Sequence, residues 1–141
     1  MKVVVDTNVL VAGLLSPFGQ CAEIVRMVSS GKLTLCLDAR IVAEYNEVLH
    51  RPKFRFNKDN VAALMEYIEH RGETIASLPL PHSLQDHDDE PFLEVAIAGQ
   101  AACIVTGNKL HFPIKLCQGI KVLSPNEFIT FYRKRQRQKS A

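Results

Sequence analysis

Short apolar runs alternate with amphipathic stretches along this chain of 141 residues. The run at Lys2–Asp6 is continuous and β-branched, which is typical of a strand buried on both faces. Further strands are predicted at 33–37, 73–78, 102–106 and 121–123. Helices are predicted at 8–15, 20–29, 39–50, 58–71, 88–100 and 125–133. Because strands and helices alternate, we expect an α/β fold with a parallel sheet and helices on both faces.

Local signals mark where several of these helices begin and end. Gly31 follows the second helix as a C-terminal stop, and Asp38 precedes the third as an N-cap. Ser124-Pro125-Asn126-Glu127 is a capping box, with proline at the first helical position.

Composition indicates one ordinary soluble domain. Apolar residues make up 47% and charged residues 23%, and no apolar run approaches the ~20 residues that span a bilayer. No secretory signal is recognisable, so we expect a cytoplasmic protein without membrane attachment. The four cysteines are widely spaced, and Cys36, Cys103 and Cys117 lie among apolar neighbours. We expect reduced core thiols rather than a zinc site.

Charge divides the chain into residues 1–132, the predicted domain, and residues 133–141, a basic tail. The tail holds five basic residues and no acid, and without them 12 basic residues face 15 acidic ones. An acidic body with a basic tail suits a metal pocket with a polyanion-binding arm. The alternative is a frayed, solubilising terminus.

Two acids have positions that suggest chemistry. Asp6 ends the first strand, and ligand sites of open α/β sheets lie at the carboxyl ends of strands. Glu44 falls on the edge of the apolar stripe of its helix, where helix meets sheet, while Glu47 points away. A solvated surface acid is the competing interpretation of Glu44.

A third source of carboxylates is the segment Asp86–Glu90, with four acids in five residues. Asp88 or Asp89 is placed to cap the helix that follows. Extending the apolar stripe of that helix backwards puts Asp89 on the same, buried face, and Asp88 is the second choice for the inward acid. The same extension places Glu90 and Glu94 away from that face. Four close acids repel one another unless a cation or solvent relieves them.

The fourth strand ends in Thr106-Gly107-Asn108, which mirrors Asp6-Thr7-Asn8 after the first strand. A plain Gly-Asn turn is the alternative. Oxygen ligands without paired cysteines favour Mg²⁺ or Mn²⁺, which lower the pKa of bound water and clamp a phosphate. A phosphatase with an aspartate nucleophile is disfavoured, because it needs a second aspartate where Asn8 stands. No histidine triad is recognisable; His87 and His111 are expected at the surface, with contact to the substrate as the alternative.

At these residues the chain resembles the PIN-domain family of metal-dependent ribonucleases, and most of all its toxin (VapC-like) branch of prokaryotic toxin–antitoxin pairs. The resemblance is carried by residues 3–10, 44–45, 48–54, 86–94, 104–109 and 122–128. It implies a three-layer α/β/α sandwich around a central parallel sheet. It also implies Mg²⁺- or Mn²⁺-dependent cleavage of single-stranded RNA, with an antitoxin protein and a second copy of the chain as partners.

Carried over by the resemblance, Asp6, Glu44 and Asp89 or Asp88 are the metal ligands and the catalytic acids. Thr7 and Asn8 would orient Asp6 or touch the phosphate, and Thr106 and Asn108 would bind substrate. Many PIN domains have a further aspartate at the place of Asn108, so a second metal ion is in question, with Asp86 or Glu90 as substitutes. Just past the helix of Glu44, Arg51, Lys53, Arg55 and Lys58 are placed to steer RNA, with Phe54 and Phe56 for base stacking. A solvated loop over a small apolar anchor is the alternative interpretation of this cluster. The alternative function is a non-catalytic PIN-like module that binds RNA or protein.

Overall fold

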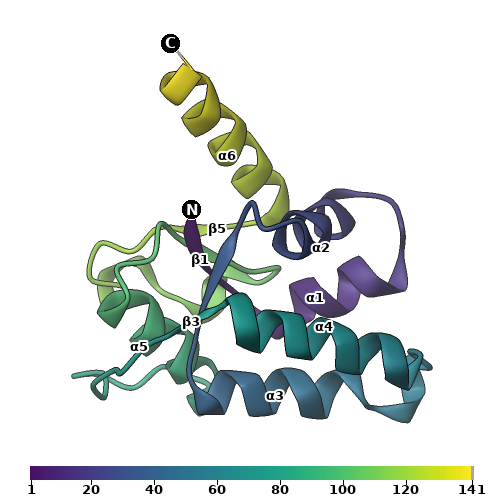
Figure 1. Cartoon of the computed structure of the whole chain (residues 1–141). Coiled ribbons are helices and arrows are strands. Elements are labelled where there is room, and N and C mark those ends of the chain that lie inside the picture. Colours follow the sequence, from purple (N-terminus) through teal and green to yellow (C-terminus); the bar gives the residue numbers. More distant parts are fainter. Residues whose placement is uncertain (141) are drawn as a thin grey trace.

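The fold is a five-stranded, all-parallel sheet covered by helices, in a computed structural model that describes residues 1–140 (Figure 1). The strands lie in the order β3-β2-β1-β4-β5. They are β1 (Lys2–Val5), β2 (Thr34–Leu37), β3 (Glu73–Thr74), β4 (Ile104–Val105) and β5 (Val122–Leu123). The helices are α1 (Thr7–Leu15), α2 (Gln20–Ser29), α3 (Ala39–Leu49), α4 (Lys58–Arg71), α5 (Glu90–Ala98) and α6 (Pro125–Ser140). The predicted α/β class is therefore confirmed.

Strand β1 lies at the centre of the sheet, between β2 and β4. Helix α5 packs against all three of these strands, and α3 and α4 both pack against β2. In Figure 1 the sheet stands between α5 on the left and α1 and α2 on the right, with α3 below. These are the layers of an α/β/α sandwich. The side chains of Val3, Val4 and Val5 are fully buried because both faces of β1 are covered.

The predicted caps form as expected. The Asp38 side chain accepts a hydrogen bond from the Ile41 N–H. At the start of α6, Ser124 Oγ accepts from the Glu127 N–H at 3.1 Å and Glu127 Oε1 accepts from the Ser124 N–H at 2.9 Å, a complete capping box. Gly31 adopts φ 82°, the left-handed conformation that ends α2. All four cysteines are free thiols, as predicted.

Several predicted boundaries were wrong. Helix α6 continues to Ser140 instead of ending near residue 133, because its glutamine, lysine and arginine residues are good helix formers. Strand β3 keeps only Glu73–Thr74 of the predicted 73–78, because it lies at the edge of the sheet. Sequence patterning also missed four short 3-10 turns: η1 (Pro52–Phe54), η2 (His87–Asp89), η3 (Lys109–His111) and η4 (Ile114–Leu116).

No single helix within residues 1–140 has the length and apolar character needed to cross a bilayer. Helices α1 and α2 reach that length and composition only as a pair bent by 103°.

Candidate active site

An open pocket of about 530 Å³ lies beyond the carboxyl ends of β1 and β4. Asp6 reaches it from the end of β1, and Glu44 reaches it from α3. The turn η2 and the residue before it add further acids. The lining acids are Asp6, Glu44, Asp86, Asp88 and Asp89. Segments far apart in the sequence thus bring all the predicted acidic candidates except Glu90 to one cavity.

Asp6 is a buried acid in the lining of this pocket. Its residue is only 8% exposed, and its Oδ2 accepts a 2.8 Å hydrogen bond from the Thr106 hydroxyl. Thr106 follows β4, is fully buried and also accepts from the Asn108 N–H at 3.1 Å. Burial raises the pKa of Asp6, and the Thr106 hydrogen bond opposes that rise. Thr106 was predicted to touch substrate, whereas the structure places it behind Asp6 as a positioning residue.

Glu44 is half-buried and faces Asp6 from α3. Its carboxylate accepts a hydrogen bond from the Thr7 hydroxyl. Burial is the main reason that its pKa is raised, and the charges of Asp6 and Asp88 add to it. The neighbouring Tyr45 hydroxyl donates to the Val5 carbonyl, which ties α3 to the end of β1. Thr7, predicted to orient Asp6, orients Glu44 through its side chain.

Asp89 carries the one buried side-chain oxygen of residues 1–140 that has no hydrogen-bond partner, its Oδ2. His111 Nδ1 lies 3.1 Å from this oxygen, close enough for an ion pair but outside hydrogen-bonding geometry. The residue is 8% exposed, and burial followed by the charge of Asp6 raises its pKa from 3.8 to about 6. Such an oxygen is costly unless a cation or a proton satisfies it.

The other acids of this segment are arranged differently from the expectation. Asp88 lines the pocket but is exposed. Neither it nor Asp89 caps the helix: Asp86 accepts from the Asp88 N–H at 2.9 Å and caps η2 instead. The reason is that Asp89 already has helical dihedral angles (φ −82°, ψ −19°), which take its side chain away from a capping position. Glu90 accepts from the Leu84 N–H and does not line the pocket.

Glu94 also turns away from the pocket, but into the protein rather than into solvent. Its Oε1 accepts from Arg40 Nη1 at 2.7 Å, and its Oε2 accepts from the Leu80 N–H at 3.2 Å. Arg40 Nη2 lies 2.7 Å from Asp38 Oδ2 as well. This network fastens the long loop after β3 to α3 and α5. It also holds the start of the segment that delivers Asp89.

His111 lines the pocket and is exposed, so its predicted place at the surface is confirmed. Its Nε2 lies 2.9 Å from Asn108 Nδ2, and its Nδ1 faces Asp89. Residues three apart eclipse one another in a 3-10 turn, so η3 brings His111 over Asn108. The Gly107-Asn108 turn signal, followed by His111 at that spacing, is the local pattern that favours placing this exposed histidine at the pocket.

Basic and aromatic residues form one rim of the pocket. Arg51, Lys53 and Phe54 line it, whereas Arg55 and Lys58 do not. Arg51 is paired with Glu47 at 2.8 Å, and Lys53 lies over the Phe54 ring at 5.0 Å. Phe54 stacks on Phe56 with a centroid separation of 5.5 Å and an interplanar angle of 19°. Cationic groups on an aromatic platform suit a nucleic-acid chain.

A family model described as PIN domain matches residues 2–110, most of the chain. The chain belongs to the PIN domain family. The match contains all five pocket acids as well as Thr106 and Asn108. An uncharacterised protein of Methanocaldococcus jannaschii is 27% identical over 95% of this chain and 93% of its own length. PIN domains are as a rule nucleases, so a phosphodiester hydrolase is the general activity that the family indicates.

PIN-domain nucleases typically use divalent metal ions, so the pocket was tested for its fit to one. Among residues 1–140 no three potential ligands already form a closed cluster. The donor set nevertheless suits a hard cation, because the pocket offers carboxylate and amide oxygens with no cysteine. The unpartnered Asp89 Oδ2 is a buried acceptor that a cation would satisfy, and burial, which raises the pKa of Asp6 and of Glu44, makes their ionised forms costly without one. The chemistry of Asp6, Glu44 and Asp89 therefore fits a divalent ion.

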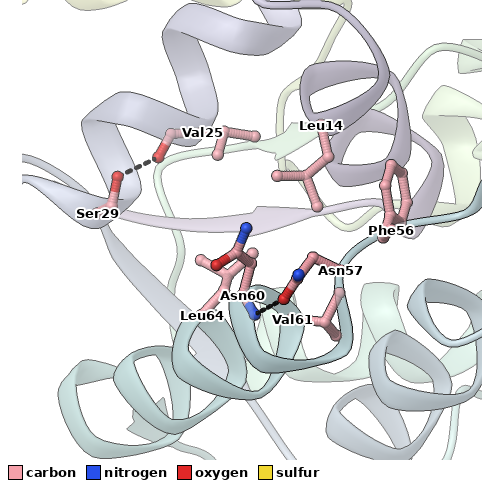
Figure 2. Close-up of a pocket in the computed structure, with 8 residues that line it drawn as sticks. All are labelled: Leu14, Val25, Ser29, Phe56, Asn57, Asn60, Val61 and Leu64. Atoms are coloured by element: carbon pink, nitrogen blue, oxygen red, sulfur yellow. Dashed lines mark hydrogen bonds between the residues drawn. The ribbon is translucent and has the colours of Figure 1, made fainter.

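This PIN domain has a second cavity, of about 310 Å³, between α1, α2 and α4 (Figure 2). Leu14 and Val25 form one wall, Val61 and Leu64 form the other, and Phe56 closes one end. The cavity contains no acid and no base. Phe56 stacks on Phe54 of the acidic pocket, so the two hollows are neighbours.

Proposed function

We propose that this PIN domain is a metal-dependent endoribonuclease that cleaves single-stranded RNA with Mg²⁺ or Mn²⁺. The observation that carries the proposal is that Asp6, Glu44 and Asp89 line one pocket and that Asp89 keeps a buried, unpartnered oxygen. These three side chains would hold the ion. When bound, the ion supplies Lewis-acid stabilisation of phosphate charge and lowers the pKa of a nearby water.

The surrounding residues prepare the pocket for this task. Thr106 holds Asp6 and Thr7 holds Glu44, and each hydrogen bond favours the ionised, ligating form of its acid. Asn8 and Asn108 line the pocket and offer amide groups to a phosphate or to the ion. Asn108 adds no charge, which supports a site with one tightly held ion.

The rim supports RNA as the substrate. Arg51 and Lys53 would attract the backbone, and Phe54 would stack on an unpaired base. Stacking of this kind requires bases that are free of a duplex, which favours a single-stranded substrate.

We further propose that the nuclease acts as the toxin of a toxin–antitoxin pair, in partnership with an antitoxin protein and as a homodimer. The resemblance of the pocket motifs to the toxin branch is the support for this part. Growth arrest on expression of the wild type, rescued by the product of an adjacent reading frame, would test it. The Asp6→Asn variant should not arrest growth.

Cleavage of unstructured RNA with Mn²⁺ or Mg²⁺, and with EDTA, tests the nuclease itself. We expect cleavage only with the ion, and loss of at least about 100-fold in Asp6→Asn and Glu44→Gln. Glu66→Gln, an exposed acid on α4, is the matched control and should cut like the wild type. If the folded wild-type protein binds RNA but does not cut it with either ion, the result would instead support the non-catalytic binding module.

A further inference from the structure

The outer half of α6 concentrates positive charge far from the acidic pocket. All five of its basic residues are exposed, and no acid follows Glu127. They are Arg133, Lys134, Arg135, Arg137 and Lys139. Figure 1 shows this end of α6 projecting from the body, on the side opposite α3, the helix that carries Glu44.

The arrangement of these residues favours a flexible polyanion over a protein groove. At ~100° per residue, Arg133 and Arg137 lie on one side of the helix and Arg135 and Lys139 on the other, with Lys134 between. No apolar residue follows Tyr132 on α6. A helix that docks in a protein groove needs an apolar stripe, which this half lacks.

Three of the five charges have no intramolecular partner among residues 1–140. Arg133 pairs with Glu23 at 3.2 Å, and Arg135 lies over the Phe131 ring at 5.0 Å. Lys134, Arg137 and Lys139 form no ion pair or side-chain hydrogen bond in the described part of the chain. Arg133 and Arg137, and Arg135 and Lys139, are like charges four residues apart, which repel one another on a helix. A bound polyanion would relieve this repulsion.

We propose that residues 133–139 of α6 form an arm that binds the phosphodiester backbone of the RNA substrate at a distance from the cleavage pocket. The proposal rests on RNA being the substrate, as proposed above. Lysine and arginine spread around a helix contact phosphates without reading bases, so the arm adds affinity but no sequence preference. Because the arm and the pocket lie on opposite sides of the body, one RNA must be long enough to reach both. A short oligonucleotide occupies the pocket alone.

The test is RNA binding in EDTA, where no cleavage interferes, measured by fluorescence anisotropy at several salt concentrations. The arm variant is Lys134→Gln/Arg137→Gln/Lys139→Gln, which spares the two arginines with structural contacts. The matched control is Lys32→Gln/Lys115→Gln/Lys121→Gln, three exposed lysines outside the arm that remove the same charge. The RNAs are unstructured chains of about 30 and about 6 nucleotides, the longer of which presents more phosphates for counterion release.

For the longer RNA, the arm variant should lower the slope of log affinity against log salt by about 2, since each phosphate contact contributes about 0.7. The ratio of variant Kd to wild-type Kd then falls roughly 20-fold between about 50 and about 200 mM salt. The short RNA should bind the arm variant and the wild type alike.

Equal effects of the arm and control variants, or equal effects on both RNAs, would overturn the proposal. An unchanged salt slope would also overturn it and leave an acidic protein as the occupant. Binding in EDTA does not depend on catalysis, so a protein that never cuts RNA can still pass this test. A nuclease whose arm variant binds as tightly as the wild type fails it.

Discussion

Replacing Asp89 with asparagine is expected to stabilise the metal-free protein while impairing its function. Asp89 keeps a buried oxygen without a hydrogen bond, and burial followed by the charge of Asp6 raises its pKa from 3.8 to about 6. An acid whose pKa is raised by folding binds more protons in the native state between these values. Stability therefore falls as pH rises through this window, and the full penalty is present above it.

The size of the penalty follows from the shift. At about 1.36 kcal/mol per pKa unit the upper limit is about 3 kcal/mol, and water in the open pocket reduces it to about 1–2 kcal/mol. Asparagine keeps the shape and removes the charge, so the melting temperature at pH 7.5 should rise by about 3–7 °C. By pH 5 about half of the difference should remain.

Thermal unfolding followed by circular dichroism in EDTA, from pH 8 to pH 5, measures this effect. Glu66→Gln, which removes an exposed charge from α4, should change the melting temperature little at any pH. With Mn²⁺ the order should reverse, because only the wild type gains full stabilisation from the ion. An Asp89→Asn variant that is less stable at neutral pH in EDTA, or a gain that does not shrink toward pH 5, would refute the reasoning.

Three further substitutions probe the support of the pocket. Thr106→Val removes the hydrogen bond to Asp6 and should reduce metal affinity and RNA cleavage about 10–100-fold, while Thr106→Ser keeps the hydroxyl and restores both. Unchanged affinity and cleavage in Thr106→Val would refute the positioning role of Thr106. Asn108→Asp should tighten Mn²⁺ binding in calorimetry and lower the melting temperature in EDTA, because it adds a carboxylate to the three proposed metal ligands; unchanged affinity would contradict this. Arg40→Met should lower the free energy of unfolding in urea by about 2–3 kcal/mol, because it leaves the buried Glu94 unpaired. Lys2→Met, which breaks the exposed pair with Glu73, should lower it by under about 1 kcal/mol, and equal losses would refute the distinction between buried and exposed pairs.

The sheet could be predicted because its signals are local. The β-branched run before Asp6 can be buried on both faces only in a covered parallel strand, and the caps at Asp38 and Ser124 depend on neighbouring residues. Convergence of Asp6 with Thr106 and Asn108 on one edge follows from that topology, since β1 and β4 are adjacent and parallel. Glu44 was within reach of the sequence because it lies at the edge of the apolar stripe of α3, while the roles of these residues stay predictions.

Contacts that depend on tertiary packing could not be predicted. Nothing local to Thr106 indicates that its hydroxyl binds Asp6, because the two are 100 residues apart. Glu94 was expected to turn away from the buried face because helical periodicity assumes one apolar stripe, whereas α5 also buries Val95, which lies outside that stripe. His111 was correctly expected at the surface, but its position beside Asp89 depends on a 3-10 turn too short to leave a periodic pattern.

Calorimetric titration of the metal-free protein with Mn²⁺ tests the shared metal site most directly. The account predicts saturable binding of one tightly held ion, weakened at least about 10-fold by each of Asp6→Asn, Glu44→Gln and Asp89→Asn and left unchanged by Glu66→Gln. Wild-type protein that binds no Mn²⁺, or binding that survives all three pocket substitutions, would contradict it.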